Sequence, residues 1–205
     1  MLEPLLHILN EKKIVLASGA PNKKQFFDNI GLKVEGCAST FEEDLDPSNF
    51  KTFAEFVEET ALQKVLEVEE RLKRENRAAD LVIGADTMVT IDNQMFGKPK
   101  DVEDAVKTLK RLSGKSNVVL TGVVVKPRGK DPIKFTQSTE VFFDVMTDAQ
   151  IRGYVATKEP MRMAGSYAIQ GKGGSFVKRI EGDYSNVIGM PVNAVCRVLT
   201  QLYGN

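Results

Sequence analysis

The chain of 205 residues carries 28 Lys and Arg against 28 Asp and Glu residues. This balance argues against a broad surface for nucleic acids or membranes, because such a surface needs a clear positive excess. Since no apolar run approaches the roughly 18 residues of a membrane span, and the acidic N-terminal stretch lacks a signal cleavage site, we expect a soluble cytoplasmic protein with no nucleic-acid or membrane partner.

The first part of the chain alternates short apolar runs with segments of helical periodicity. Residues 13–18 (KIVLAS) predict a buried strand, followed by a small-residue turn and a helix over residues 22–30. Residues 32–37 predict a second strand that leads into an acidic loop. Apolar side chains spaced by about 3.6 residues from Thr52 to Arg77 predict a long amphipathic helix.

The rest of the chain continues this alternation and includes two long strands. Residues 80–87 (DLVIGADT) predict a buried strand, and residues 117–125 and 133–145 predict an antiparallel pair. The other predicted elements are helices at 101–112, from Thr147 with a capping box, and at 191–203, a glycine-rich loop at 171–174 and a strand at 175–180. We therefore expect a single mixed α/β domain over residues 1–205, with the long hairpin indicating a second lobe.

The scarcity of histidine limits the chemistry that the chain can perform. Its one histidine, His7, lies in a short amphipathic segment near the N-terminus. A Ser-His-Asp triad, a Cys-His pair or a His-rich zinc site would all have to use it. Hydrolysis without histidine depends on carboxylates, lysines and a hard cation such as Mg²⁺, which prefers oxygen ligands.

The turn after the first strand has the layout of a phosphate site. A helix N-terminus directs backbone N–H groups and partial positive charge toward one point, and Lys23 and Lys24 lie in this first turn. The alternative is an ordinary strand-to-helix turn with solvated lysines.

Acidic and basic side chains elsewhere form a second candidate site. Asp86 is predicted at the end of a buried strand, where open α/β sheets bind ligands, although a hydrogen-bonded turn aspartate has about even odds. The acidic run 42–44 becomes a metal site only if folding brings one carboxylate near Asp86, and is otherwise a solvated loop. Lys98, between Gly97 and Pro99, suits a cleft but is also typical of a solvated turn.

Two common nucleotide-binding motifs are absent. The glycine-rich run 169–174 is not a dinucleotide fingerprint, because Phe176 stands where its third glycine is required. Residues 114–116 (GKS) are not a P-loop, because Leu109 stands where the leading glycine is required. Dehydrogenase and P-loop kinase functions are therefore disfavoured.

Six segments nevertheless occur together in one order. They are LASGAP with its basic followers (16–24), IGADTMV (83–89), GKP (97–99), LTGV (120–123), AGSYAIQGKGG (164–174) and EGDYSNVIGMPV (181–192). In this order they resemble the Maf family of nucleoside triphosphate pyrophosphatases over residues 13 to about 203.

The resemblance implies a function, a fold and a set of partners. It implies metal-dependent hydrolysis of nucleoside triphosphates to the monophosphate and pyrophosphate, with Mg²⁺ or Mn²⁺ as cofactor. The implied fold is a mixed, strongly twisted sheet with helices on both sides and two lobes around a cleft, like inosine triphosphate pyrophosphatase. Homodimers are common in the family.

The resemblance also assigns roles to individual residues. The family's proton acceptor falls on Asp86, and its acidic pair on Glu42 and Glu43, of which we favour Glu43 as a metal ligand together with Asp86. The cleft lysine falls on Lys98. The remaining matches are to the phosphates (Ser18, Asn22, Lys23, Lys24), to a lysine of the long helix (Lys64) and to the base (Thr87, Gln170).

Base choice and two departures leave alternatives open. Thr87 and the run around Gln170 resemble the branch acting on dTTP, UTP and modified pyrimidine nucleotides, whereas the N7-methyl-GTP branch differs at both places. Ala-Pro-Asn-Lys (20–23) replaces the usual Ser-Pro-Arg-Arg, and Arg162-Met163 replaces an Asp-Lys pair. Lysine lacks the bidentate fork of arginine, so the alternatives are an N7-methyl-GTP-type pyrophosphatase, a nucleotide-binding protein with weak or no catalysis, and a non-enzymatic interaction module.

Overall fold

The structure is a computed structural model that describes residues 1–204. Its strands are β1 (Ile14–Leu16), β2 (Glu35–Gly36), β3 (Leu81–Ile91), β4 (Gln94–Phe96), β5 (Ser116–Pro127), β6 (Ile133–Phe143) and β7 (Val177–Glu181). Its α-helices are α1 (Leu6–Leu9), α2 (Pro21–Asn29), α3 (Phe53–Arg74), α4 (Val102–Leu112), α5 (Asp148–Ala156), α6 (Tyr184–Ile188) and α7 (Val192–Tyr203). The predicted mixed α/β class is confirmed.

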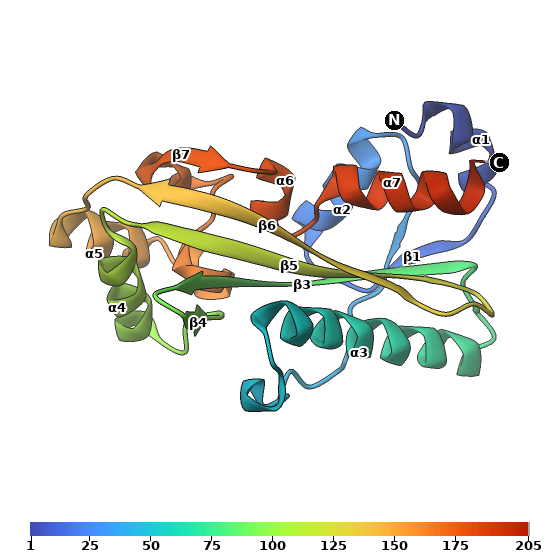
Figure 1. Cartoon of the computed structure of the whole chain (residues 1–205), viewed down its shortest axis with the longest axis horizontal. Coiled ribbons are helices and arrows are strands. Elements are labelled where there is room, and N and C mark those ends of the chain that lie inside the picture. The colour runs from blue at the N-terminus through green and yellow to red at the C-terminus, as the bar shows by residue number, and fades with distance from the viewer. Residues whose placement is uncertain (205) are drawn as a thin grey trace. The chain divides into compact units, whose positions relative to one another are not determined.

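All seven strands belong to one mixed sheet (Figure 1). The strand order is β2-β1-β3-β5-β6-β7, and β4 pairs with β3 off this path. β1 runs parallel to both β2 and β3, whereas β4 is antiparallel to β3 and β7 is antiparallel to β6. β5 and β6 are neighbours joined by a short turn, so they form the predicted antiparallel hairpin.

The chain divides into two compact units. The first comprises residues 1–86, 121–137 and those from Gly189 on, and the second comprises residues 87–120 and 138–188. The single domain predicted over residues 1–205 stays a prediction, and its last residue, Asn205, lies outside the described residues.

In the first unit, helices cover both faces of the sheet. β3 alternates its side chains between the faces, as strands do: Leu81, Ile83 and Ala85 join a core with Phe27 of α2 and Leu199 of α7. On the other face, Val82 joins a core built with α3, whose members include Ala61, Val65 and Val68. The predicted placement of helices on both sides of the sheet is therefore confirmed for this unit (Figure 1).

Two glycines allow α3 to lie directly on the sheet. A Cβ atom added at Gly122 of β5 would stand 2.4 Å from the backbone carbon of Val57 and 2.5 Å from the backbone nitrogen of Glu58. A Cβ atom at Gly84 of β3 would stand 2.4 Å from Cγ2 of Val65. Because real atoms cannot approach so closely, a side chain at either position would push the helix away from the sheet.

The second unit has a core of its own. α4 and α5 bury apolar side chains, among them Leu109, Leu112 and Ile151, against Val89 of β3 and Val141 of β6. The predicted caps are confirmed: the Asp101 side chain accepts from Asp104 N–H at 2.8 Å, and a capping box joins Thr147 with Gln150.

Three local predictions differ from the structure. β3 does not end at Thr87 but continues to Ile91, because residues 89–91 pair with β4, an edge strand that sequence patterning missed. β1 and β2 are shorter than predicted, since they pair only through residues 15–16 and 35–36 with each other. The short helix α6 was also missed, and the glycine-rich segment forms a 3₁₀ helix over Lys172–Phe176.

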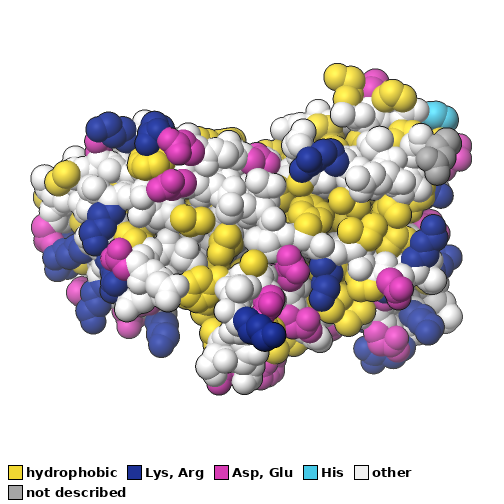
Figure 2. Space-filling model, in the orientation of Figure 1, with side chains coloured by type: hydrophobic (Ala, Val, Ile, Leu, Met, Phe, Trp, Pro, Cys, Tyr) yellow, Lys and Arg dark blue, Asp and Glu magenta, His cyan; other side chains and the backbone are white. Residues whose placement is uncertain are grey.

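The described residues contain no helix long and apolar enough to cross a membrane. On the face drawn in Figure 2, acidic and basic side chains are interspersed rather than gathered in one patch of a single sign. This pattern agrees with the balanced count of charged residues.

The packing of α3 on Gly122 predicts a large effect of a single methyl group. We expect Gly122→Ala to lower the free energy of unfolding by about 1–3 kcal/mol or more, because the nearest atoms are helix backbone that cannot rotate away. Gly153→Ala is the matched control: Gly153 is an exposed position of α5 with open space around it, so the same change should be neutral or stabilise by about 0.5–1 kcal/mol. Chemical denaturation measures both, and equal stability of the two variants would contradict the close approach.

Candidate active site

A lysine of α3 lies between two carboxylates in the first unit. The Lys64 ammonium donates to Oδ1 of Asp86 at 2.6 Å and lies 3.0 Å from Oε1 of Glu43. The side chains of Lys64 and Asp86 are only 12% and 14% exposed, whereas that of Glu43 is 46% exposed. The fold thus brings together three of the residues predicted from sequence.

The position of Asp86 follows from strand pairing. β1 ends at Leu16, which pairs with Ile83, so Asp86 lies three residues beyond the end of its parallel neighbour. Asp86 shares a face of β3 with Val82 and Gly84, because strand side chains alternate, and this is the face covered by α3. The predicted location beyond a carboxyl end therefore holds for β1, although β3 itself continues.

The charges of this cluster support one another. Burial alone would lower the pKa of Lys64, but the carboxylates of Asp86 and Glu43 outweigh burial and raise the pKa above its ordinary value. The ammonium therefore stays charged over the physiological range and offsets the cost of placing a carboxylate where little water reaches it.

The loop that carries Glu43 is held by other side chains of α3. Glu67 accepts a hydrogen bond from Thr40 N–H at 2.9 Å and from the Ser39 hydroxyl at 3.0 Å. Arg71 donates to Glu67 at 2.7 Å and to the Ala38 carbonyl at 2.7 Å. Lys64, Glu67 and Arg71 follow helical spacing, so they lie along one side of α3.

Two residues of the predicted phosphate turn lie beside this cluster. Lys23, in the first turn of α2, donates its Nζ to the carbonyl oxygen of Ala85 at 3.0 Å, one residue before Asp86. Ser18 follows β1, and its hydroxyl accepts from Ala20 N–H at 3.2 Å, which shapes the entry into α2.

Lys24 is directed elsewhere. Its ammonium pairs with Asp28 at 2.7 Å along α2. It lines a surface cavity of about 420 Å³ together with Lys12, Lys13 and Lys33. This cavity lies at the start of β1, whereas Ser18 follows the end of that strand. Asn22 is exposed in the first turn of α2. Phosphate binding by Lys24 and Asn22 stays a prediction that this geometry does not favour for Lys24.

The cluster suits a hard divalent cation. Asp86 and Glu43 supply carboxylate oxygens, the ligands that Mg²⁺ prefers, and both oxygens lie within 3.0 Å of one positively charged nitrogen. Among residues 1–204, no group of three or more His, Cys, Asp or Glu could hold a metal ion. Two carboxylates completed by water and substrate phosphates are a usual way of binding Mg²⁺, so the residues present fit this cation.

The other predicted site residues belong to the second unit. Thr87 follows Asp86 on β3 with its side chain on the opposite face. Lys98 and Gln170 are both exposed. Gln170 precedes a glycine-rich turn, and the Glu159 carboxylate accepts from the N–H groups of Lys172 and Gly173 at 3.1 Å each.

Sequence reasoning missed the residues that hold these loops. Glu67 and Arg71 were available in principle, since they lie three and seven residues after Lys64 in a predicted helix. Glu159 carried no such signal, because its bonds to Lys172 and Gly173 join segments that only the tertiary structure brings together.

Comparison with known proteins gives a family and several relatives. Residues 13–202 match the family model described as Maf-like protein. The dTTP/UTP pyrophosphatase of Bacillus cereus (strain ATCC 10987 / NRS 248) is 40% identical over 201 residues, which are 96% of this chain and 95% of that protein. A Homo sapiens protein named probable bifunctional dTTP/UTP pyrophosphatase/methyltransferase protein is 41% identical over 211 residues, which are 99% of this chain and 34% of that protein. The chain thus spans about a third of the human relative.

Among solved structures, a HAM1 protein from Coxiella burnetii matches with a TM-score of 0.49 and 17% identity, covering 93% of this chain and 99% of that one. The Ham1 protein of Staphylococcus aureus matches with a TM-score of 0.47 and 15% identity, with the same coverage.

The hydrogen bonds to Glu67 predict a pH dependence of stability. Partial burial alone would raise the pKa of Glu67, but bonds from Arg71, Thr40 and Ser39 outweigh it and lower the pKa from 4.5 to about 2. The stabilisation is therefore complete above about pH 4.5 and is lost as the pH falls through about 2. We expect Glu67→Gln to reduce the acid-induced loss of unfolding free energy over this range, measured by denaturant titration. Identical slopes for the variant and the parent chain would contradict the assignment.

Proposed function

We propose that this chain, which belongs to the Maf-like protein family, hydrolyses nucleoside triphosphates to the monophosphate and pyrophosphate. The proposal is supported by relatives of similar length named dTTP/UTP pyrophosphatase, at 40–41% identity over at least 93% of this chain. The observation that carries it is the convergence of Asp86, Lys64 and Glu43, which places acidic and basic side chains of the proposed reaction at one point.

In the proposed reaction, Asp86 acts as the general base. A water oxygen attacks the α-phosphorus, and one water proton passes to the Asp86 carboxylate. The bond from the α-phosphorus to the oxygen that bridges to the β-phosphate breaks, and its electron pair leaves with pyrophosphate. Lys64 keeps Asp86 ionised and oriented, because its ammonium donates to Oδ1 at 2.6 Å.

Asp86 and Glu43 are the residues that would hold Mg²⁺ or Mn²⁺. A bound divalent cation offsets negative charge on phosphate oxygens in the transition state. Lys23 and Lys98 are proposed to contact the phosphates, and the entry to α2 at Ser18 and Asn22 offers backbone N–H groups for the same purpose.

The proposed substrates are dTTP, UTP or modified pyrimidine nucleotides. This choice depends on Thr87 and Gln170 as contacts to the base, and on the names of the relatives. The turn after Gln170 is held by Glu159, which fixes the backbone that presents this side chain.

Replacing the proposed base tests the chemistry. We expect Asp86→Asn to retain the fold and to lower the rate of pyrophosphate release by at least about 10²-fold, because a positioned general base contributes about 10²–10⁴-fold. The assay uses dTTP, UTP, CTP and N7-methyl-GTP with Mg²⁺ or Mn²⁺. Glu43→Gln should also lose activity, whereas Asp44→Asn, a change at the neighbouring exposed carboxylate, should not.

Other outcomes of this assay would redirect the proposal. Normal turnover by the Asp86→Asn variant would exclude Asp86 as the base. Preference for N7-methyl-GTP would assign the sister branch. Binding of triphosphates by the folded parent chain without pyrophosphate release would favour a nucleotide-binding protein.

The two adjacent lysines of α2 give a matched pair. We expect Lys23→Ala to lower kcat/KM by about 10–100-fold, the usual effect of losing a charge-assisted interaction. Lys24→Ala should change kcat/KM little, because its ammonium is already paired with exposed Asp28. Steady-state kinetics with dTTP or UTP measure both, and a larger effect at Lys24 would show that the phosphates bind on the other side of the turn.

A further inference from the structure

The segment that carries Glu43 has no regular secondary structure to hold it. β2 ends at Gly36, and the next element, a 3₁₀ turn, begins at Pro47. Between them, a local bond joins Asp44 N–H to the Glu42 carbonyl, which cannot fix the loop to the rest of the fold. The position of Glu43 must therefore come from side-chain contacts with a rigid element.

The ion pair of Glu43 itself is too weak to hold the loop. Its carboxylate is 46% exposed and lies 3.0 Å from the Lys64 ammonium. Exposed or half-exposed pairs of this kind typically contribute about 0–1 kcal/mol. In addition, Lys64 is shared with Asp86, to which it lies closer, at 2.6 Å.

The stronger attachment is one helical turn further along α3. The Glu67 carboxylate accepts from both Ser39 and Thr40, and Ser39 Oγ in turn accepts from Phe41 N–H at 3.1 Å. Arg71 orients the same carboxylate and closes the loop from the other end through the carbonyl of Ala38. These are charge-assisted bonds to backbone groups, which are about twice as strong as neutral ones.

Both the loop and Lys64 are therefore attached to the same rigid helix. Glu67 lies three residues after Lys64, so the two side chains are neighbours on one side of α3. Thr40, which Glu67 holds, is three residues before Glu43 in the chain.

We propose that Glu67 is a positioning residue for the metal site: it holds residues 38–41 so that Glu43 meets Asp86 at a divalent cation. The inference rests on the proposed function, because it concerns the same site. Glu67 acts on the cation only through the loop.

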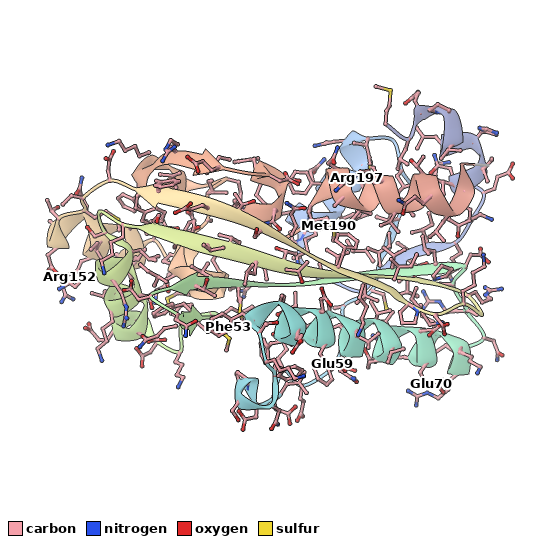
Figure 3. The ribbon with its side chains drawn as sticks, in the orientation of Figure 1. Phe53, Glu59, Glu70, Arg152, Met190 and Arg197 are labelled. Atoms are coloured by element: carbon pink, nitrogen blue, oxygen red, sulfur yellow. The ribbon has the colours of Figure 1, made fainter. Side chains whose placement is uncertain are left out.

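Hydrogen exchange tests the attachment without any ligand or turnover. In the full chain, Glu67→Ala should speed exchange of the Thr40 amide by about tenfold or more, because that N–H loses its charged acceptor. Amides of the core strand β3, such as Val82, should exchange as in the parent chain. Glu70→Ala is the matched control, since Glu70 is an exposed carboxylate of the same helix (Figure 3). Glu67→Gln, which keeps one oxygen acceptor, should give an intermediate effect.

Binding of Mn²⁺ alone, measured by calorimetry or electron spin resonance, tests the consequence for the site. We expect Glu67→Ala to weaken Mn²⁺ binding by about tenfold, the lower end of the effect of losing an outer-shell partner, and Glu70→Ala to leave it unchanged. Unchanged Thr40 exchange, or unchanged Mn²⁺ affinity in the Glu67 variant, would overturn the inference. Absence of Mn²⁺ binding in the parent chain would also overturn it. That result would be traced to the proposed function, because Thr40 exchange reports on the attachment separately.

Discussion

The close packing of α3 on two glycines of the sheet is the constraint on which the candidate site depends. At Gly84 and Gly122 the helix lies nearer to the strands than any side chain would allow. This approach sets the height of Lys64 above β3, so that its ammonium meets Asp86 at 2.6 Å. The same helix presents Glu67 and Arg71 to the loop that carries Glu43. A single rigid element therefore fixes one side of the site.

The electrostatics of the cluster follow from this placement. Asp86 is 14% exposed, and a carboxylate with so little water needs compensation. Lys64 supplies it, and the raised pKa of the lysine reflects the mutual stabilisation. A partly exposed Glu43 leaves one side of the cluster open to a ligand. Neutralised on one side and open on the other, the carboxylates suit a hydrolase that binds an anionic substrate together with a cation.

Periodicity and turn chemistry allowed most of the fold to be predicted from sequence. The amphipathic pattern located α3, and the caps at Asp101 and Thr147 were correct, because these signals are local. β4 was missed, since its pairing with β3 is a tertiary property, and the continuation of β3 past Thr87 follows from that pairing.

For the site, residue types and motif order indicated Asp86, Glu43 and Lys64, but not how they meet. Lys23 and Lys24 are equivalent in sequence, and only the structure separates them, with Lys23 beside Asp86 and Lys24 paired with Asp28. The attachment of the acidic loop to Glu67 spans 27 residues, and no local signal encodes the contact.

The most direct test of the account follows the oxygen of the attacking water. The full chain would hydrolyse dTTP or UTP with Mg²⁺ in ¹⁸O-labelled water, and mass spectrometry would locate the label in the products. Attack on the α-phosphorus predicts one ¹⁸O atom in the nucleoside monophosphate and none in pyrophosphate. Label in pyrophosphate, or release of orthophosphate in its place, would contradict the proposed reaction.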